Sequence, residues 1–190
     1  MRLTPVLLAS RLGSATLCCT DCRASSFPYC SAEELSWKER SPRLLAELIK
    51  NLDADVLLLQ EVDKPDVFAA ALPGYECFFV KRPGKKADGC LTAWRKDVFR
   101  RDDAFDAQVV DCNAIASQLA KEKFRRDNIG TLVLLQHMAT GRAVLVAQTH
   151  LYWNPEMRDV KLTQCLFLVN HMRALVQQLE AERCGQRVAV

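Results

Sequence analysis

No stretch of the chain approaches the roughly 20 consecutive apolar residues that cross a bilayer. The longest apolar runs are broken by Gln60, Glu61, Gln148 and His150. We therefore expect no membrane-spanning helix. Glycine and proline, at seven residues each, are too few for a collagen-like or low-complexity chain, and a hydrophobic share of 49% is too high for a disordered one. The 190 residues are expected to form one globular domain with a sizeable core.

Signatures of the common nucleotide-binding and hydrolase folds are also missing. The glycines form neither a G-x-x-x-x-G-K-[ST] loop nor a G-x-G-x-x-G loop, and the chain has no G-x-S-x-G elbow and no internal repeat. The net charge of +3 tolerates a polyanionic partner but is far below the excess of a general nucleic-acid binder. Composition alone therefore does not identify the partner.

The nine cysteines do not form the paired Cys/His doublets of a zinc site. Cys19 and Cys22 make a single C-x-x-C motif, whose role stays open. Later cysteines, such as Cys77 and Cys165, lie in apolar segments, so we predict reduced thiols in the core.

Residues 1–30 differ from the rest, with three arginines, many Ser and Thr and no acidic side chain in the first 20 positions. This composition fits a transit peptide for a mitochondrion or plastid. The alternative, which we favour, is a divergent first strand of a cytoplasmic protein: Met1–Ala9 carries the apolar stretch Val6–Ala9 and would be an edge strand interrupted by Pro5.

From Ser31 onward, the residue pattern predicts helices and strands. Ser31 and Glu34 form a capping box, and leucines at helical spacing predict an amphipathic helix that continues to Leu52 and bends near Pro42. Asp55–Val62 is a short continuous apolar run between polar flanks, which predicts a strand buried on both faces.

Two hairpins follow from paired apolar runs with turn residues between them. Tyr75–Lys81 and Gly89–Lys96 flank an Arg-Pro-Gly turn and a basic loop, and Thr131–Met138 and Ala143–Leu151 flank a short segment that contains Gly141. We predict that both pairs are antiparallel.

Helical spacing predicts a surface helix over Asn113–Arg126 and a long helix ending before Gly185. The predicted apolar face of the long helix consists of Val160, Leu162, Leu166, Val169, Met172, Val176 and Leu179. Arg187–Val190 begins a further strand. This element order predicts an α/β or α+β fold, in which helices cover a mixed β-sheet.

Two polar side chains end buried strands. Glu61 closes the strand DVLLLQEV, and a buried carboxylate must be paired or bind a cation, although an ordinary ion pair is the alternative. His150 ends AVLVAQTHL in the same way, and its alternative is a hydrogen-bonded core histidine. His137 and His171 are interpreted as structural.

Five blocks together resemble the endonuclease/exonuclease/phosphatase superfamily. They are similar to the carbon catabolite repressor type of deadenylase, the branch that includes nocturnin and the Angel proteins, and the resemblance covers residues 29–190. QEVD and THLYWNP are its most specific parts. The blocks are WKERSPRLL at Trp37–Leu45, ADVLLLQEVD at Ala54–Asp63, ADGCLTAW at Ala87–Trp94, DNIGTLVLL at Asp127–Leu135 and THLYWNPEMRDVKLTQ at Thr149–Gln164.

This resemblance implies the N-terminal half of a DNase-like four-layer sandwich, with residues 31–190 as an incomplete domain. It implies a Mg²⁺-dependent hydrolase, with Mn²⁺ as an alternative ion, that removes nucleotides from the 3′ end of single-stranded RNA and prefers poly(A). The alternatives are a nocturnin-like nucleotide phosphatase and a non-catalytic fragment or binding module. No protein partner is indicated, and no repeat suggests an adaptor.

Site residues follow from the same resemblance. Glu61 matches the magnesium-binding glutamate, and His150 matches the histidine that contacts the scissile phosphate. Lys81 resembles a basic residue near substrate phosphates. Nocturnin-type proteins carry basic residues in the stretch where this chain has Asn154, and this difference favours a deadenylase. Asn154 is therefore a substrate-binding candidate. Pro155 either lies against the adenine or is a turn proline before the long helix.

The sequence departs from the family at two places. The family's first strand carries an asparagine of the metal site, and the best counterpart, Pro5–Ala9, places Val6 there. A D-x-N strand and a late Asp-His pair would follow Val190. We therefore expect about half a catalytic site, a sheet that lacks its partner sheet, and weak or no nuclease activity of these 190 residues.

Overall fold

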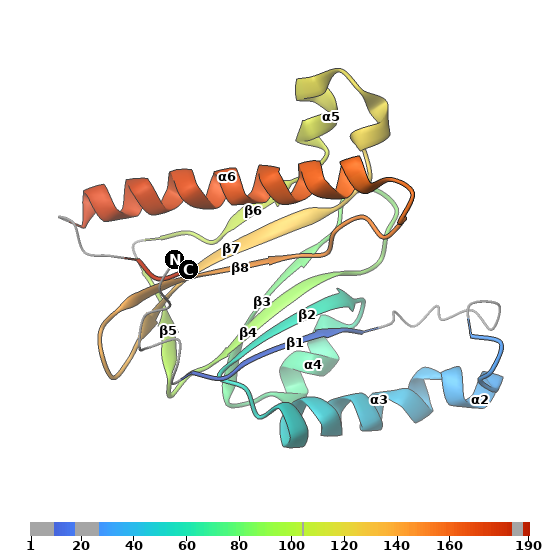
Figure 1. Cartoon of the computed structure of the whole chain (residues 1–190). Coiled ribbons are helices and arrows are strands. Elements are labelled where there is room, and N and C mark those ends of the chain that lie inside the picture. The colour runs from blue at the N-terminus through green and yellow to red at the C-terminus, as the bar shows by residue number, and fades with distance from the viewer. Residues whose placement is uncertain (1–9, 18–26, 104, 184–187) are drawn as a thin grey trace.

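Two sheets packed face to face form the centre of the molecule (Figure 1). The computed structural model describes residues 10–17, 27–103, 105–183 and 188–190, with the backbone alone for 50–52. Helices α3 (Trp37–Ala46) and α4 (Pro65–Ala71) cover one sheet, and α6 (Arg158–Glu182) covers the other. The predicted α/β class, with helices over mixed strands, is confirmed.

The first sheet has the strand order β1-β2-β4-β3. Its strands are β1 (Leu12–Thr16), β2 (Val56–Val62), β3 (Tyr75–Lys81) and β4 (Gly89–Arg95). Strand β1 is parallel to β2, and the other pairs are antiparallel. The run predicted to be buried on both faces is the interior strand β2, which has helices on one side and the second sheet on the other. The predicted β3–β4 hairpin is also confirmed.

The strand beside β2 corrects one prediction. It is Leu12–Thr16, whereas the sequence favoured Pro5–Ala9, which lies outside the described residues. Strand β1 pairs with β2 through its backbone, and Ala15 packs against the core beside Leu17, which directly follows the strand. The Thr16 hydroxyl adds a hydrogen bond to Gln60 Oε1 at 3.1 Å. Strand β1, with the sequence LGSAT, still contains no asparagine.

The second sheet is built around β7 (Ile129–His137). Strand β7 pairs antiparallel with β5 (Phe99–Arg101), β6 (Gln108–Asp111) and β8 (Ala143–Thr149), so the second predicted hairpin is confirmed. Ala189 bridges Val144 in parallel orientation, as expected for the start of a strand.

The expectation of a sheet without its partner is wrong, because the chain contributes strands to both layers. It crosses between them in a short turn after β4, where the Val98 N–H donates to the Arg95 carbonyl at 3.2 Å. Trp94 and Phe99, on either side of this turn, are buried between the sheets. The residues that Trp94 and Phe99 contact between the sheets lie far away in the sequence. Local hydrophobic periodicity therefore could not predict this crossing.

Apolar side chains fill three layers between the four layers of secondary structure. The first lies between the helices α3 and α4 and the first sheet, the second between the two sheets, and the third between the second sheet and α6. Representative members are Leu57, Leu59 and Phe68 for the first, Val56, Trp94 and Val133 for the second, and Leu132, Leu134 and Leu168 for the third. Burying each such side chain contributes about 1.5–3 kcal/mol.

The N-terminal helical region is interrupted at Ser36 rather than at Pro42. The capping box of Ser31 and Glu34 starts α2 (Ala32–Leu35), as predicted. Ser36 then adopts an extended backbone and its hydroxyl accepts the Glu39 N–H, so a second helix, α3, begins. Pro42 lies inside α3, which passes into the π-helix η2 (Glu47–Leu52).

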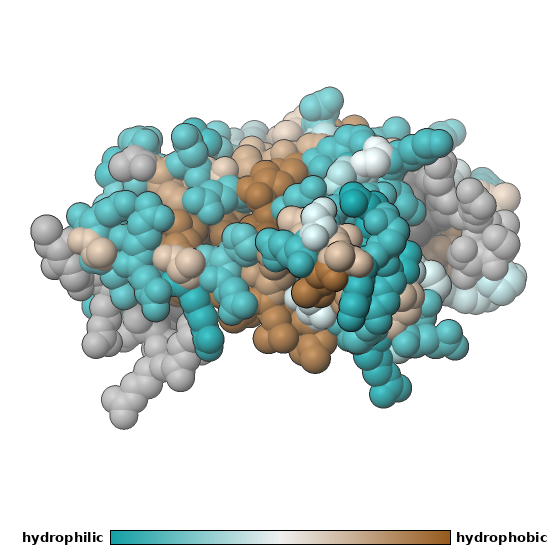
Figure 2. Space-filling view, turned by 90° about the horizontal axis from the view of Figure 1, so that it is seen from above, coloured by the Kyte–Doolittle hydropathy of each residue, from teal (hydrophilic) through white to brown (hydrophobic). Residues whose placement is uncertain are grey.

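The predicted apolar face of α6 is only partly correct. Leu162 and Leu166 are 60% and 53% exposed, and the buried positions include Gln164 and Leu168. Because the polar Gln164 lies on the buried face, the spacing of apolar residues alone does not identify that face. Figure 2, which views the α6 side, shows hydrophobic patches within a mainly hydrophilic surface. Gly185 lies outside the described residues.

Two further expectations need correction. The segment Asn113–Arg126 forms the short helix α5 (Ala114–Leu119) and the 3₁₀ turn η3 (Glu122–Phe124), and its Ile115 and Phe124 pack against Val160 of α6 instead of lying on the surface. Cys165 is exposed, not in the core. Burial raises the pKa of Cys90 to about 11 and of Cys112 to about 12, as expected for inert core thiols.

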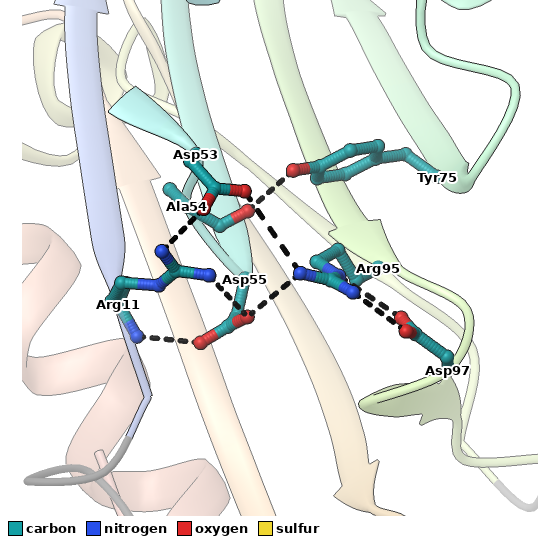
Figure 3. A network of polar contacts seen from close by, with 7 residues as sticks. All are labelled: Arg11, Asp53, Ala54, Asp55, Tyr75, Arg95 and Asp97. Carbon is teal, nitrogen blue, oxygen red and sulfur yellow. Dashed lines mark hydrogen bonds and ion pairs between the residues drawn. The ribbon is translucent and has the colours of Figure 1, made fainter. Parts of the chain in front are cut away.

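A polar network closes the end of the first sheet that is remote from Glu61 (Figure 3). The Arg11 N–H donates to the Asp55 carboxylate at 2.7 Å, and the Arg95 guanidinium binds Asp97 through two nitrogens at 2.6 and 3.0 Å. These contacts tie β1, β2 and β4 together, so the charged groups at this end have structural partners.

No helix in the described part of the chain is long and apolar enough to cross a membrane.

Candidate functional site

Glu61 and His150 meet where strands of the two sheets end. Glu61 lies near the end of β2, and His150 directly follows β8. Their facing atoms, Glu61 Oε1 and His150 Nε2, are 3.8 Å apart, and the side chains are 30% and 23% exposed. The structure therefore brings together the two residues that the sequence singled out, at a position that solvent reaches.

A buried glutamine fixes this approach. Gln148 Nε2 donates to the Leu59 carbonyl at 2.7 Å, and Gln148 Oε1 accepts from the Thr92 hydroxyl at 2.7 Å. Gln148 and Leu59 each lie two residues before the pair, on opposite sheets. Because the hydrogen-bonding groups of a buried amide must all be satisfied, this contact sets how β8 lies against β2.

The backbone of Glu61 is locally strained. Its φ of +57° lies in the left-handed region, and the β2–β4 register shifts between Gln60 and Val62. Such a conformation costs a non-glycine residue about 1–3 kcal/mol and occurs where a strand must redirect a side chain. Here the bulge redirects the carboxylate at the end of β2.

Two buried amides hold the loop that follows His150. Asn128 Nδ2 donates to the His150 carbonyl at 2.7 Å, and Gln164 Nε2 donates to Asn128 Oδ1 at 3.1 Å. The Tyr152 N–H in turn donates to Gln164 Oε1 at 2.9 Å. Both amide side chains are buried, so Asn128, directly before β7, and Gln164 of α6 together position the backbone on either side of Leu151.

Burial lowers the pKa of His150 below its ordinary value. Glu61 opposes this shift, the Arg82 guanidinium reinforces it, and Asp88 opposes it. Arg82 and Asp88 form a largely buried ion pair at 3.0 Å that closes the β3–β4 loop. The imidazole is therefore neutral at pH 7 and can donate one hydrogen bond.

The other predicted site residues make local contacts. Lys81 is exposed at the same end of the sheet and donates to the Arg82 carbonyl at 3.3 Å. Asn154 Oδ1 accepts the Glu156 N–H at 2.9 Å, and Pro155 is exposed in the turn before α6. Their roles toward substrate stay predictions.

Sequence reasoning missed the polar residues that support the pair. These are Gln148, Asn128 and Gln164, together with the Arg82–Asp88 ion pair. Asp88, Asn128 and Gln164 lie inside the blocks ADGCLTAW, DNIGTLVLL and THLYWNPEMRDVKLTQ that carried the family resemblance. Their position inside these blocks was the signal that could have identified them.

The donor groups fit a magnesium ion that keeps most of its water. The Glu61 carboxylate offers hard oxygen ligands. Within the described ranges, no three His, Cys, Asp or Glu side chains are arranged so that they could hold a metal ion. Mg²⁺ commonly binds one or two carboxylates and completes its shell with water and phosphate oxygens. Cys19 and Cys22 lie outside the described residues.

Comparisons with known proteins place this site in context. The sequence profile of the "Endonuclease/Exonuclease/phosphatase family" matches residues 29–167. Protein angel homolog 2 of Homo sapiens is 34% identical over 173 residues, which cover 83% of this chain and 29% of that protein. Carbon catabolite repressor protein 4 homolog 4 of Arabidopsis thaliana is 31% identical over 182 residues, which cover 79% of this chain and 43% of that protein.

One solved structure has a similar fold and sequence. The crystal structure of ANGEL2, described as a 2′,3′-cyclic phosphatase in complex with adenosine-2′,3′-vanadate, matches with a TM-score of 0.70 and 32% identity. The match covers 87% of this chain and 48% of that chain. The present chain thus spans less than half the length of these relatives.

Proposed function

Because the chain belongs to the endonuclease/exonuclease/phosphatase family, we propose that it is a Mg²⁺-dependent hydrolase of phosphate esters at the 3′ end of RNA. The preferred substrate in this proposal is a single-stranded poly(A) tail, shortened as by a deadenylase. The observation that carries the proposal is the 3.8 Å approach of the Glu61 carboxylate to the His150 imidazole at the meeting ends of two sheets.

The residues suit this chemistry. Glu61 would hold a Mg²⁺ ion, which when bound would supply Lewis-acid polarisation of the phosphoryl group. The neutral imidazole of His150 donates a hydrogen bond from Nε2 to a phosphate oxygen, where negative charge increases during hydrolysis. Asn128 and Gln164 hold the His150 backbone, so this donor is oriented before substrate binds.

A second candidate reaction is hydrolysis of a terminal 2′,3′-cyclic phosphate. The ANGEL2 structure supports it, because that protein is described as a 2′,3′-cyclic phosphatase and shares 32% identity with 87% of this chain. Both reactions attack a phosphate at an RNA 3′ terminus, so the same carboxylate and imidazole serve either one.

A panel of three 5′-labelled oligonucleotides tests the proposal. They share one body and end in an A tail with a 3′-hydroxyl, a U tail with a 3′-hydroxyl, or an A tail with a 2′,3′-cyclic phosphate. With protein in molar excess and Mg²⁺ present, we expect slow shortening of the A tail, faster than of the U tail, and none in EDTA.

The other outcomes are equally informative. Opening of the cyclic phosphate without shortening selects the second reaction. If all three oligonucleotides survive at every Mg²⁺ concentration, the proposal of hydrolysis by this chain is wrong, and retention of the label by intact protein would indicate a binding module.

A further inference from the structure

Arg126 is a cation that the described structure does not neutralise. Its guanidinium carbon lies 4.9 Å from the centre of the Tyr152 ring, and its Nη2 donates only to the Met157 sulfur at 3.5 Å. Arg126 Nε is buried, and no hydrogen-bond partner for it occurs among the described residues. The ring holds the guanidinium in place, but no carboxylate within the described ranges forms an ion pair with it.

Two other arginines do have carboxylate partners. Arg82 pairs with Asp88 at 3.0 Å, and Arg125 pairs with Glu122 at 2.6 Å. Asp127, the nearest carboxylate in sequence to Arg126, instead accepts from Asn113 Nδ2 at 2.9 Å. A partly buried charge without a counter-ion is costly unless a ligand supplies one. A guanidinium matches the oxygens of a phosphate in two parallel hydrogen bonds.

Arg126 lies at the same end of the second sheet as His150. Asn128, two residues after Arg126, donates to the His150 carbonyl, and Tyr152 is two residues after His150. The segments 126–128 and 150–152 therefore run alongside each other, joined at both ends by the Asn128 and Arg126 contacts. The Arg126 guanidinium therefore lies along the chain segment that directly follows His150.

An exposed aromatic ring lies beside Tyr152, the ring on which Arg126 stacks. Trp153 is 75% exposed, and its ring centre is 6.1 Å from that of Tyr152. Single-stranded nucleic acids bind where a basic group contacts the backbone and an aromatic ring stacks on a base. This combination favours an oligonucleotide over a free phosphate ion as the ligand.

We propose that Arg126, stacked on Tyr152, binds an internucleotide phosphate of single-stranded RNA next to the phosphate at His150. The proposal rests on the proposed function for the identity of the substrate. It adds a second phosphate-binding position, so that the site binds at least two nucleotides of one strand.

Binding of a fluorescent A-tailed oligonucleotide in EDTA tests the subsite without hydrolysis. Anisotropy titrations over a range of salt concentrations compare the parent protein with Arg126→Ala and with the matched control Arg125→Ala. Both variants lose one positive charge. We expect Arg126→Ala to weaken binding about tenfold, since a charge-assisted contact is lost, and to reduce the slope of log affinity against log salt by about 0.7.

The control and two further variants separate the subsite from general charge. Arg125→Ala should change affinity less than about twofold. Arg126→Lys keeps the charge and should bind between the parent protein and Arg126→Ala, while Tyr152→Phe keeps the ring and should bind like the parent protein. Equal losses in Arg126→Ala and Arg125→Ala would overturn the subsite, as would no binding by the parent protein.

The two proposals fail in different ways. If the parent protein binds but does not hydrolyse RNA, and Arg126→Ala binds more weakly, the subsite stands and the proposed function fails. If the parent protein hydrolyses RNA and the two arginine variants bind alike, the proposed function stands and the subsite fails.

Discussion

Replacement of Glu61 by glutamine is expected to slow Mg²⁺-dependent hydrolysis by about 10²–10³-fold. Glutamine has nearly the same shape but no negative charge, so it keeps the packing at the end of β2 and loses the ligand for the cation. A loss of a few kcal/mol in transition-state stabilisation gives this factor, at tenfold for each 1.4 kcal/mol. The measurement is the single-turnover rate on the A-tailed oligonucleotide.

Glu76→Gln is the matched control. Glu76 is exposed on β3, away from Glu61. Its replacement therefore removes the same charge without changing the contact between Glu61 and His150. We expect the parent rate and the same unfolding temperature for this variant. Equal rates for Glu61→Gln and the parent protein would remove Glu61 from the site.

Replacement of Gln148 by leucine is expected to lower the free energy of unfolding by about 2–4 kcal/mol, because two buried hydrogen bonds are lost and the buried Thr92 hydroxyl loses its acceptor. Urea denaturation measures this loss. The same variant should also lose activity, since the contact between Gln148 and the Leu59 carbonyl sets the distance between Glu61 and His150.

Gln136→Leu controls for the change of residue type. Gln136 is half-buried on β7, at the other end of the second sheet, and its amide contacts Arg100 and the Gly141 carbonyl. Water can replace these partners, so we expect a loss below about 1 kcal/mol. If the two variants were destabilised equally, Gln148 would have no special role between the sheets.

Local sequence patterns were sufficient to predict much of the fold. Continuous apolar runs identified β2 and both hairpins because each strand pairs with near neighbours or is buried on both faces. The capping box of Ser31 and Glu34 marked a helix start, since its hydrogen bonds lie within three residues. The polar residues that ended apolar strands, Glu61 and His150, also proved to be neighbours in space.

Long-range contacts account for the errors. The division of the strands between two sheets depends on side chains that meet only after folding, such as Trp94 with Val133. Strand β1 was missed because LGSAT contains no apolar run of its own and its partner strand β2 lies 44 residues further along the chain. The buried face of α6 contains Gln164, whose partner Asn128 lies 36 residues away, so hydrophobic spacing alone predicted only part of that face.

The central claim is that one divalent cation bound by Glu61 lies beside the imidazole of His150. The most direct measurement follows the ring signals of the three histidines by NMR while Mn²⁺, a paramagnetic substitute for Mg²⁺, is added below stoichiometry. The account predicts selective broadening of His150, with His137 and His171 unaffected, and loss of this effect in Glu61→Gln. Uniform broadening of all three rings, or broadening of His150 that persists in Glu61→Gln, would contradict it.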